Sequence, residues 1–539
     1  MNKQIKTPIV ILLIILALIV GAYWGASVTL RSKKNTSASS TLYSGSTGEK
    51  TNILWNIIAN NYVDDIENDS LSDRIYASLL SALDPHSTYL TPKDLTAEME
   101  SLRGNFEGVG IVLRMINDTI RAAQIIAGGP AEKAGMEPGD YILSVNGEAV
   151  SGVKMKVEDV VKKLRGPRKS VADIKIKRLS ENGTRFVKVV RNVIETPSLS
   201  YSGMIDQRTG YIHLSRFGET TYSEFRQALT ELKKKGMERL VLDLRDNGGG
   251  LMSAATKICD DLLPGREMIV YTEGAHQPRQ EERSKPGGLF GKGDLVVLIN
   301  EYTASASEIV AGAMQDNDRG IIAGRRSFGK GLVQQQFRLP DNSAILLTIA
   351  RYYTPSGRCI QRPYSNGSDE YYEDFIQQII NGYANDSLLA QITDSTPYHT
   401  TKGRTVYGGG GIYPDHIISY KSDTLIVYYN QLVTKGIISE YVFDFVSRKG
   451  REIKKQHPDA EDFIAHYTVS NDMLEDVFDQ AANKGLVRNN NSIKKYRKEI
   501  LSRIKAEIGD MLYGTPTFQA VMLWSDPELQ EALTLFKKR

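Results

Sequence analysis

The chain has 539 residues, too many for one ordinary domain, and its length alone suggests roughly three or four domains. Apolar residues make up 41% of the chain, enough for sizeable hydrophobic cores, and 67 basic against 64 acidic residues leave a net charge of +3. Because the charge is so nearly balanced, the composition gives no support to nucleic-acid binding, and we expect no nucleic-acid partner.

Residues 1–30 contain an uncharged apolar stretch, residues 8–26, that predicts a membrane anchor or a signal sequence. A helix of that length spans roughly 28 Å, close to the hydrocarbon thickness of a bilayer, whereas the apolar cores of signal peptides have about 7–15 residues. Tyr23 and Trp24 suit the far membrane interface. We therefore expect a single-pass anchor, with a cleaved signal peptide as the alternative.

The location of the remaining chain follows from the orientation of that anchor. Two lysines precede the apolar stretch and three basic residues follow it, so the positive-inside rule orients the helix only weakly. With the short N-terminus inside, everything after the flexible serine-rich linker at residues 31–49 would lie outside the cytoplasm. We expect a membrane protein with a periplasmic catalytic part, or a protein secreted to the periplasm if the stretch is cleaved.

Residues 50–103 are expected to be helical. Apolar residues recur at helical spacing, as at Leu54 and Ile57. Thr91 followed by Pro92 predicts the capped start of a further helix, because threonine caps helix N-termini and proline fits the first turn.

Residues 104–192 have the pattern of a small β-rich domain. A glycine-rich loop runs into an apolar strand at residues 108–113. Asn146-Gly147 predicts a tight turn after a strand, and residues 157–164 predict a short amphipathic helix.

Residues 193–420 have the pattern of an α/β domain with a parallel sheet. Residues 240–244, apart from Asp243, and residues 295–299 are apolar runs, which are typical of strands buried on both faces. Residues 320–324 predict a third strand, and a β-hairpin is expected about residues 340–343.

Two further segments complete the chain. Residues 362–403 are polar and rich in tyrosine, and we interpret them as an insertion in the α/β domain. Residues 421–539 are mostly amphipathic helix and contain no motif that names a function.

Cysteine and histidine do not form the clusters that bind metals. Cys259 and Cys359 lie far apart and neither has metal-ligand spacing, although a disulfide between them stays open as an alternative. The seven histidines are scattered, and we interpret each as a surface residue or a satisfied interior residue. We expect neither a metal nor a cofactor.

Ser305 and Lys330 are the candidate catalytic pair. A serine hydroxyl is a poor nucleophile until a base removes its proton, and lysine is a base only when burial without a carboxylate partner lowers its pKa. Lys330 lies between two glycines, and no acidic residue lies within ten positions on either side. Gln334 would hold the lysine amine without adding a charge. The sequence therefore predicts a serine hydrolase with lysine as its base.

The helix that follows Ser305 is the candidate oxyanion site. Backbone N–H groups at a helix N-terminus point outward and favour negative charge. The N–H of Ala306 and an N–H from the glycine turn at residues 248–250 would stabilise a tetrahedral oxyanion. Ser307 stays open as a competing nucleophile, because spacing alone does not exclude it.

A nucleotide-binding loop is excluded by the residue at one of its required positions. Residues 324–330 fit the first seven places of a phosphate-binding loop, but the eighth place is Gly331, where that loop needs serine or threonine for magnesium. A strand is also expected after this segment in place of a helix.

The motifs occur together in one order, and the chain resembles the C-terminal processing, or tail-specific, proteases, which are serine peptidases of bacteria and plastids. The resemblance covers about residues 50 to 420. The stretches that carry it are residues 83–90, 104–192, 242–250, 303–308, 327–331, 353–357 and 360–361.

The resemblance implies a multidomain α/β fold and a set of site residues. The protease core would be crotonase-like, with an inserted PDZ domain, an N-terminal transmembrane helix before it and a helical extension after it. The carboxylate-binding loop of the PDZ domain would be Gly108, Val109, Gly110 and Ile111. The catalytic residues would be Ser305, Lys330 and Gln334, with Ala306 and either Gly249 or Gly250 as the oxyanion hole, and Glu308 and Asp316 match acidic positions of the family.

The expected function is therefore that of a serine endopeptidase. It would bind protein or peptide substrates by free, apolar C-termini through the PDZ domain and cleave peptide bonds with a Ser–Lys dyad. A catalytically silent PDZ scaffold or adaptor at the membrane is the alternative. Association with the membrane through residues 8–26 is expected, and a homo-oligomer stays open.

Overall fold

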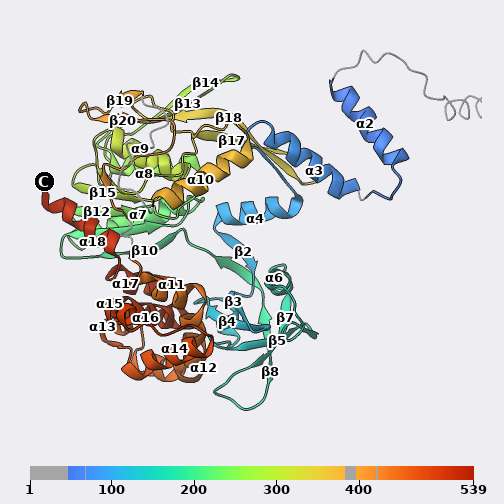
Figure 1. Cartoon of the computed structure of the whole chain (residues 1–539), viewed down its shortest axis with the longest axis vertical. Helices are drawn as coiled ribbons and strands as arrows, with labels where there is room; N and C mark the ends of the chain where they lie inside the picture. The colour runs from blue at the N-terminus through green and yellow to red at the C-terminus, as the bar shows by residue number, and fades with distance from the viewer. Residues whose placement is uncertain (1–46, 67, 383–395, 420–422, 539) are drawn as a thin grey trace, which may run out of the picture. The chain divides into compact units, whose positions relative to one another are not determined.

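The computed structural model describes residues 47–66, 68–382, 396–419 and 423–538 (Figure 1). The apolar stretch at residues 8–26 lies outside these residues. Within them, no helix is both long and apolar enough to cross a membrane. The chain divides into two units, Met1–Arg74 and Ile75–Arg539, and each is described by itself.

The described part of the first unit is helical, as predicted. Helix α2 covers Thr47–Asn61, and α3 (Asn68–Ser81) runs across the boundary between the units. The apolar residues that predict α2 stay exposed, with Leu54 at 58% and Ile57 at 54%.

Helix α4 (Pro92–Arg103) starts at the predicted cap. Thr91 Oγ1 accepts a hydrogen bond of 3.3 Å from the N–H of Asp94. The helix ends at Gly104, whose φ of 71° is left-handed, and the chain passes directly into strand β2 (Asn105–Gly108).

The β-rich segment forms an antiparallel sheet with strand order β3-β4-β5-β7-β8, and β6 pairs with β5. Strands β2 and β9, which begin and end this segment, pair with each other. The predicted helix is α6, and Asn146 and Gly147 turn between β5 and β6 with φ of 52° and 84°. The bounds are β3 Ile111–Ile116, β4 Thr119–Ile125, α5 Pro130–Lys133, β5 Tyr141–Val145, β6 Glu148–Ala149, α6 Val157–Leu164, β7 Val171–Lys177, β8 Arg185–Val190 and β9 Asn192–Glu195.

A six-stranded sheet with order β10-β11-β12-β15-β16-β21 forms the centre of the α/β domain. Strands β11, β12, β15, β16 and β21 are parallel, as the continuous apolar runs predict, and β10 is antiparallel to β11. The bounds are β10 Leu199–Met204, β11 Thr209–Leu214, α7 Thr221–Lys234, β12 Arg239–Asp243, α8 Met252–Leu262, β15 Asp294–Ile299, α9 Ala306–Asp316, β16 Ile321–Gly324 and β21 His416–Ile417.

The two faces of this sheet are buried by different elements. Leu242 and Val297 belong to a core with α7, α8 and α9, whereas their neighbours Val241 and Val296 pack with the end of the chain. Burial on both faces explains why these strands have no polar alternation. Cys259 is buried in the first core and forms no disulfide with Cys359, so the disulfide alternative is wrong.

A second sheet has the order β1-β18-β13-β14, with β17 paired to β18. Its β17–β18 pair is the predicted hairpin, and a strand follows Lys330 where a phosphate-binding loop would have a helix. The bounds are β1 Thr88–Leu90, β13 Met268–Gly274, β14 Gln277–Arg283, β17 Leu332–Arg338 and β18 Ala344–Tyr353. The insertion contains α10 (Ser368–Gly382), and β19 (Pro397–His399) pairs with β20 (Thr405–Tyr407).

The C-terminal segment is helical, as predicted, and its first six helices share a hydrophobic core of their own. The bounds are α11 Ile426–Thr434, α12 Ile437–Gln456, α13 Ala460–His466, α14 Asn471–Asn483, α15 Asn490–Lys495, α16 Arg497–Tyr513, α17 Thr515–Leu523, α18 Pro527–Thr534 and the 3₁₀ helix η2 Leu535–Lys538.

This helical segment contacts the β-rich domain on strands β4 and β5. Arg121 Nη1 lies 3.0 Å from a carboxylate oxygen of Asp444, and its guanidinium lies 4.9 Å from the ring centres of Tyr141 and Phe443. Ser447 Oγ donates to the carbonyl of Gly139 at 3.1 Å. The face of the sheet formed by these strands is thus occupied within the chain itself.

Candidate active site

Ser305 lies where strand β15 leads into helix α9. Its backbone has φ 56° and ψ −116°, a combination that costs a non-glycine residue about 1–3 kcal/mol. Hydrogen bonds of the two preceding residues hold the turn: Thr303 Oγ1 donates to the carbonyl of Leu244 at 2.8 Å, and the N–H of Ala304 donates to that of Asn247 at 3.0 Å. The surrounding structure therefore fixes the serine in a strained position immediately before the helix.

The competing serine, Ser307, is committed elsewhere. Its side chain is 0% exposed, and its hydroxyl donates to the carbonyl of Asn247 at 2.9 Å. Ser305, by contrast, is only half-buried. The geometry favours Ser305 over Ser307 as the nucleophile.

Lys330 lies in the loop between β16 and β17, with backbone packed closely around it. A side chain at Gly329 or Gly331 would meet neighbouring backbone atoms at 3.0 Å and 2.9 Å. The amine Nζ donates to Gln334 Oε1 at 2.8 Å, and Lys330 forms no ion pair with any described residue. Burial lowers the pKa of Lys330, against weaker opposing effects of the Asp84 and Glu308 carboxylates.

Glu308 connects the loop of Ser305 to the loop of Lys330. Its Oε2 accepts the backbone N–H of Ser305 at 2.8 Å and that of Lys330 at 2.9 Å. Its Oε1 accepts the hydroxyl of Ser327 at 2.5 Å and the N–H of Gly329 at 2.7 Å. Burial raises the pKa of Glu308 to about 7, although these four donors lower it. One buried carboxylate thus sets the spacing of both loops without contacting the lysine amine.

The hydroxyl of Ser305 and the amine of Lys330 are not hydrogen-bonded to each other; the described partner of the amine is Gln334. Catalytic hydrogen bonds are often long in proteins without substrate and tighten when substrate binds. The shared carboxylate oxygen of Glu308 nevertheless places the two backbones side by side.

Gly249 and Gly250 follow strand β12 and have different surroundings. A Cβ at Gly249 would lie 2.8 Å from Ser305 Cβ and 2.9 Å from the nitrogen of Ala306, so only glycine fits against the serine. The N–H of Gly249 donates to Asn247 Oδ1 at 2.9 Å. Gly250 has a φ of 133° and lies against the carbonyl of Phe217. The structure thus brings Gly249 to Ser305 and Ala306, with Gly250 next in the chain, and commits the N–H of Gly249 to an internal partner.

The glycine-rich loop at the end of β2 borders a small groove. Gly108, Val109, Gly110 and Ile111 line a cavity of about 70 Å³. Its remaining walls are apolar side chains of β2, β3 and α6, together with Arg165. The groove therefore combines a turn of backbone amides with an apolar floor.

Three parts of the chain match known protein families. Residues 208–366 match peptidase family S41, residues 121–178 match the PDZ domain, and residues 428–514 match a family of unknown function. The carboxy-terminal-processing protease of Bartonella bacilliformis is 36% identical over 313 residues, which cover 57% of this chain and 71% of that protein. The chain belongs to the carboxy-terminal-processing proteases.

Two further proteins are similar to this chain. The carboxyl-terminal-processing protease of a Picosynechococcus species is 36% identical over 278 residues, which cover 50% of this chain and 66% of that protein. Among solved structures, the photosystem II D1 C-terminal processing protease is 32% identical, with a TM-score of 0.34 and coverage of 57% of this chain and 83% of that one. The matches to peptidase family S41 and to the PDZ domain, together with the C-terminal helices, make the protein a serine protease with a PDZ domain and a helical C-terminal region.

The protease places one residue beside the lysine that the sequence interpretation left out. The backbone carbonyl of His86 accepts a hydrogen bond from Gln334 Nε2, and His86 Nε2 lies 3.0 Å from the hydroxyl of Tyr371. Burial, with the nearby positive charge of Lys330, lowers the pKa of His86 to about 4. His86 is a satisfied interior histidine, as expected of each histidine, but it supports the glutamine that holds the base.

Helix α10 of the insertion packs against both sides of the protease site. Phe375 contacts Phe328 and Tyr302, with ring centres 4.7 Å and 6.0 Å apart. Tyr302 lies three positions before Ser305, and Phe328 lies two positions before Lys330. Tyr371, 1% exposed, contacts His86 from the same helix. The insertion is thus part of the wall of the site, which its polar composition did not predict.

Asp316, at the other end of α9, has a structural contact. It forms a fully buried ion pair of 2.7 Å with Arg358 and also accepts the hydroxyl of Ser356 at 2.6 Å. These contacts anchor the end of the helix that begins at the nucleophile.

Proposed function

We propose that this protease is a tail-specific endopeptidase that cleaves peptide bonds with Ser305 as nucleophile and Lys330 as general base. The observation that carries the proposal is the arrangement of the lysine, whose amine is buried, has a lowered pKa and is held by the uncharged Gln334. The shared carboxylate of Glu308 supports the pairing, because it holds both loops on one oxygen atom.

The proton and bond changes follow from these positions. Neutral Lys330 takes the proton of the Ser305 hydroxyl while the oxygen attacks the carbonyl carbon of the substrate. The oxyanion accepts hydrogen bonds from the N–H of Ala306 and from the glycine turn, where Gly250 is the better donor because Gly249 is committed to Asn247. The lysine returns its proton to the leaving amine, and water then hydrolyses the acyl-enzyme.

The PDZ domain would select the substrate. In the proposal, backbone N–H groups of the Gly108–Ile111 loop bind the free carboxylate of the tail, and the tail adds as a strand beside β3. The apolar floor of the groove favours an apolar last residue.

A peptide assay tests the two halves of the proposal separately. An unstructured substrate with an apolar C-terminus is offered as the free acid and as the amide to the unmodified protease and to its Ser305→Ala and Lys330→Ala variants. We expect cleavage of the free acid to be preferred, and each variant to lose about 10⁴-fold or more in kcat with an unchanged fold. Near-normal turnover by Lys330→Ala would refute the dyad, and equal cleavage of acid and amide would refute tail recognition.

We also propose that residues 8–26 anchor the protease in the membrane with its catalytic part in the periplasm. The support is the length and the apolar composition of the stretch. A mass spectrum of the mature protein from membranes tests this. A mass that lacks the N-terminal residues would indicate a cleaved signal peptide.

A further inference from the structure

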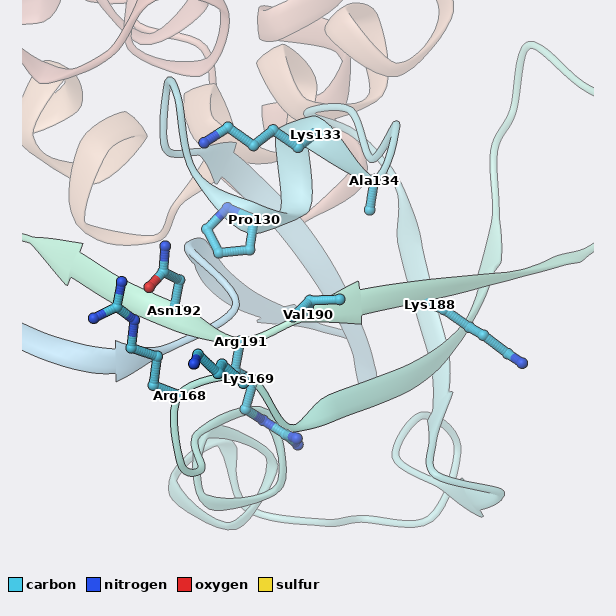
Figure 2. A pocket seen from close by; sticks show the side chains of 9 residues that line it. All are labelled: Pro130, Lys133, Ala134, Arg168, Lys169, Lys188, Val190, Arg191 and Asn192. Carbon is cyan, nitrogen blue, oxygen red and sulfur yellow. The ribbon is translucent and has the colours of Figure 1, made fainter.

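A basic basin lies on the PDZ domain, outside the protease site (Figure 2). Its volume is about 390 Å³, and five of its lining residues are cationic while none is acidic. The cationic residues are Lys133, Arg168, Lys169, Lys188 and Arg191. This local imbalance contrasts with the whole chain, in which 67 basic residues face 64 acidic ones.

Four of these cations are available to a ligand. Lys133, Arg168, Lys169 and Lys188 are exposed and form no ion pair with any residue in the part of the chain that the structure describes. The fifth, Arg191, is buried and donates to backbone carbonyls, so it belongs to the wall.

Lys188 has an acidic residue opposite it in the sheet, but that residue does not neutralise its charge. Asp173 on β7 stands opposite Lys188 on β8, but the two side chains form no ion pair. Other cations of the same domain do have internal partners: Arg178 contacts the carboxylate of Asp140 at 2.6 Å. The basin differs from such a paired site, because five cations line it and no carboxylate does.

The basin also has an apolar part. Pro130, Ala134 and Val190 line it between the cationic side chains, and Val190 is 55% exposed. Val190 belongs to β8, which is an edge strand of the described sheet. An apolar floor with a cationic rim fits a chain that carries both apolar and acidic groups, and it does not fit a small inorganic anion as well.

The carboxylate loop forms the boundary between the basin and the tail groove. Asn192 of the basin pairs with Gly108 of the loop in the β2–β9 ladder. The N–H of Ala131, next to Pro130, donates to the carbonyl of Val109 at 2.9 Å. A tail whose carboxylate rests on this loop would therefore end beside the basin.

We propose that the basin is a second specificity contact for the substrate tail, selecting tails with acidic residues among their last positions. This inference rests on the proposed tail recognition. Side chains of a bound strand alternate, so that inward ones fill the apolar groove and outward ones near the carboxylate come within reach of Arg168 and Lys169. The substrate class is thus a C-terminus in which apolar and acidic residues alternate.

Binding of four peptides to the catalytically silent Ser305→Ala protein tests the basin. The peptides share an apolar last residue, carry either aspartate or asparagine at the outward positions, and end in a free acid or an amide. At low salt we expect the aspartate free acid to bind about three- to tenfold more tightly than the asparagine free acid. Added salt should remove this difference, because the cations are exposed.

Charge reversal locates the effect. Lys169→Glu with Lys188→Glu should abolish the preference for aspartate and weaken binding of the asparagine free acid far less, because only the terminal carboxylate of that peptide meets the reversed charges. Lys177→Glu, an exposed lysine of β7 outside the basin, is the matched control and should retain the preference.

Each other outcome has a defined meaning. Equal affinity for the two free acids, with both weakened by amidation, overturns the basin and leaves tail recognition intact. If amidation changes nothing, tail recognition itself fails. Binding to vesicles of anionic phospholipid that depends on Lys169 and Lys188, without any preference for aspartate peptides, would make the basin a membrane contact and overturn the proposal.

Discussion

Charged side chains have opposite surroundings in the protease site and in the PDZ domain. At the site, Glu308 is surrounded by four donors and Asp316 is sealed against Arg358, while the lysine amine meets an uncharged amide. In the basin of the PDZ domain, four cations face outward without partners among the described residues. The proposed role of Lys330 as a base requires a dry environment without a counter-ion, whereas the proposed capture of a chain end requires exposed charge that acts at a distance.

The largest effect on activity is expected when a charge is placed beside Lys330, because the amine would then have a counter-ion. In Gln334→Glu a carboxylate replaces the amide that accepts from Lys330 Nζ at 2.8 Å. An adjacent opposite charge should raise the pKa of Lys330 by about 1–3 units. The neutral base is lost as pH falls through that pKa, so the acid limb of kcat/KM should move to higher pH by the same amount.

The neighbouring Gln335→Glu is the matched control for this pH profile, because Gln335 is exposed on the same strand. Its acid limb should stay where that of the unmodified protease lies. An unshifted profile in Gln334→Glu would mean that the amine does not act as the base.

The next largest effect is expected from Glu308→Gln. An amide can accept on only one oxygen, so at least one of the four donors would face another donor, at a cost of about 1–3 kcal/mol. Activity should fall about 10- to 100-fold because the two loops lose their common anchor. Steady-state kinetics, with circular dichroism to check the fold, measures this loss.

Glu308 also predicts a pH dependence of stability. Its pKa is raised from 4.5 to about 7 in the folded protein, so the folded state binds this proton more tightly than the unfolded state. The contribution of Glu308 to the free energy of unfolding is therefore largest below pH 4.5 and decreases as pH rises to about 7. Urea unfolding across this range should give a flatter pH dependence for Glu308→Gln, and an unchanged slope would contradict the raised pKa.

On the PDZ side, Gly110→Val should reduce selection of the tail. Gly110 has a φ of 76°, and an added Cβ would lie 3.2 Å from Ile194 Cδ1, so valine would distort the carboxylate loop. We expect cleavage of the free-acid substrate to fall about tenfold, toward that of the amide.

Gly128→Val is the matched control for the loop. Gly128 has a similar φ of 70° in the same domain, but its Cβ would meet open space. It should therefore share the backbone strain and retain the preference for free acids. A loss in both variants would assign the effect to general destabilisation of the domain.

The smallest effect is expected from the inserted helix. Tyr371→Phe removes the hydroxyl that contacts His86 Nε2 at 3.0 Å, a hydrogen bond worth about 1 kcal/mol. We expect a loss of at most about tenfold in kcat with little change in KM, since Gln334 is held by the backbone of His86. Tyr62→Phe, which alters a tyrosine that is 61% exposed, should leave kcat unchanged, and equal losses in both variants would contradict the positioning role.

Local patterns in the sequence predicted the elements that local forces decide. The cap at Thr91, the helix at residues 157–164 and the Asn146-Gly147 turn occur as expected, because side chains close in sequence determine them. Apolar continuity likewise predicted the parallel strands, since both faces of such a sheet are buried. Ser305 and Lys330 were predicted as a pair from their residue types and from the residues next to them in the sequence.

The supporting contacts of the site were not predictable in this way. Gln334 and His86 are 248 positions apart, and nothing near either residue signals the other. The contact of Tyr371 with His86 spans 285 positions and joins the insertion to the segment that precedes the PDZ domain. Such contacts depend on how separate elements pack, and the spacing of apolar residues in the sequence does not predict that packing.

By itself, the sequence determined the family's motifs, the order of the elements and the residue types available for chemistry. Tertiary packing set which of those residues meet: Glu308 with the loops of Ser305 and Lys330, α10 with the wall of the site, and five cations from three segments around one basin. The physical reason is that hydrogen bonding and turn formation act over a few residues, whereas burial and electrostatic surroundings are properties of the packed chain.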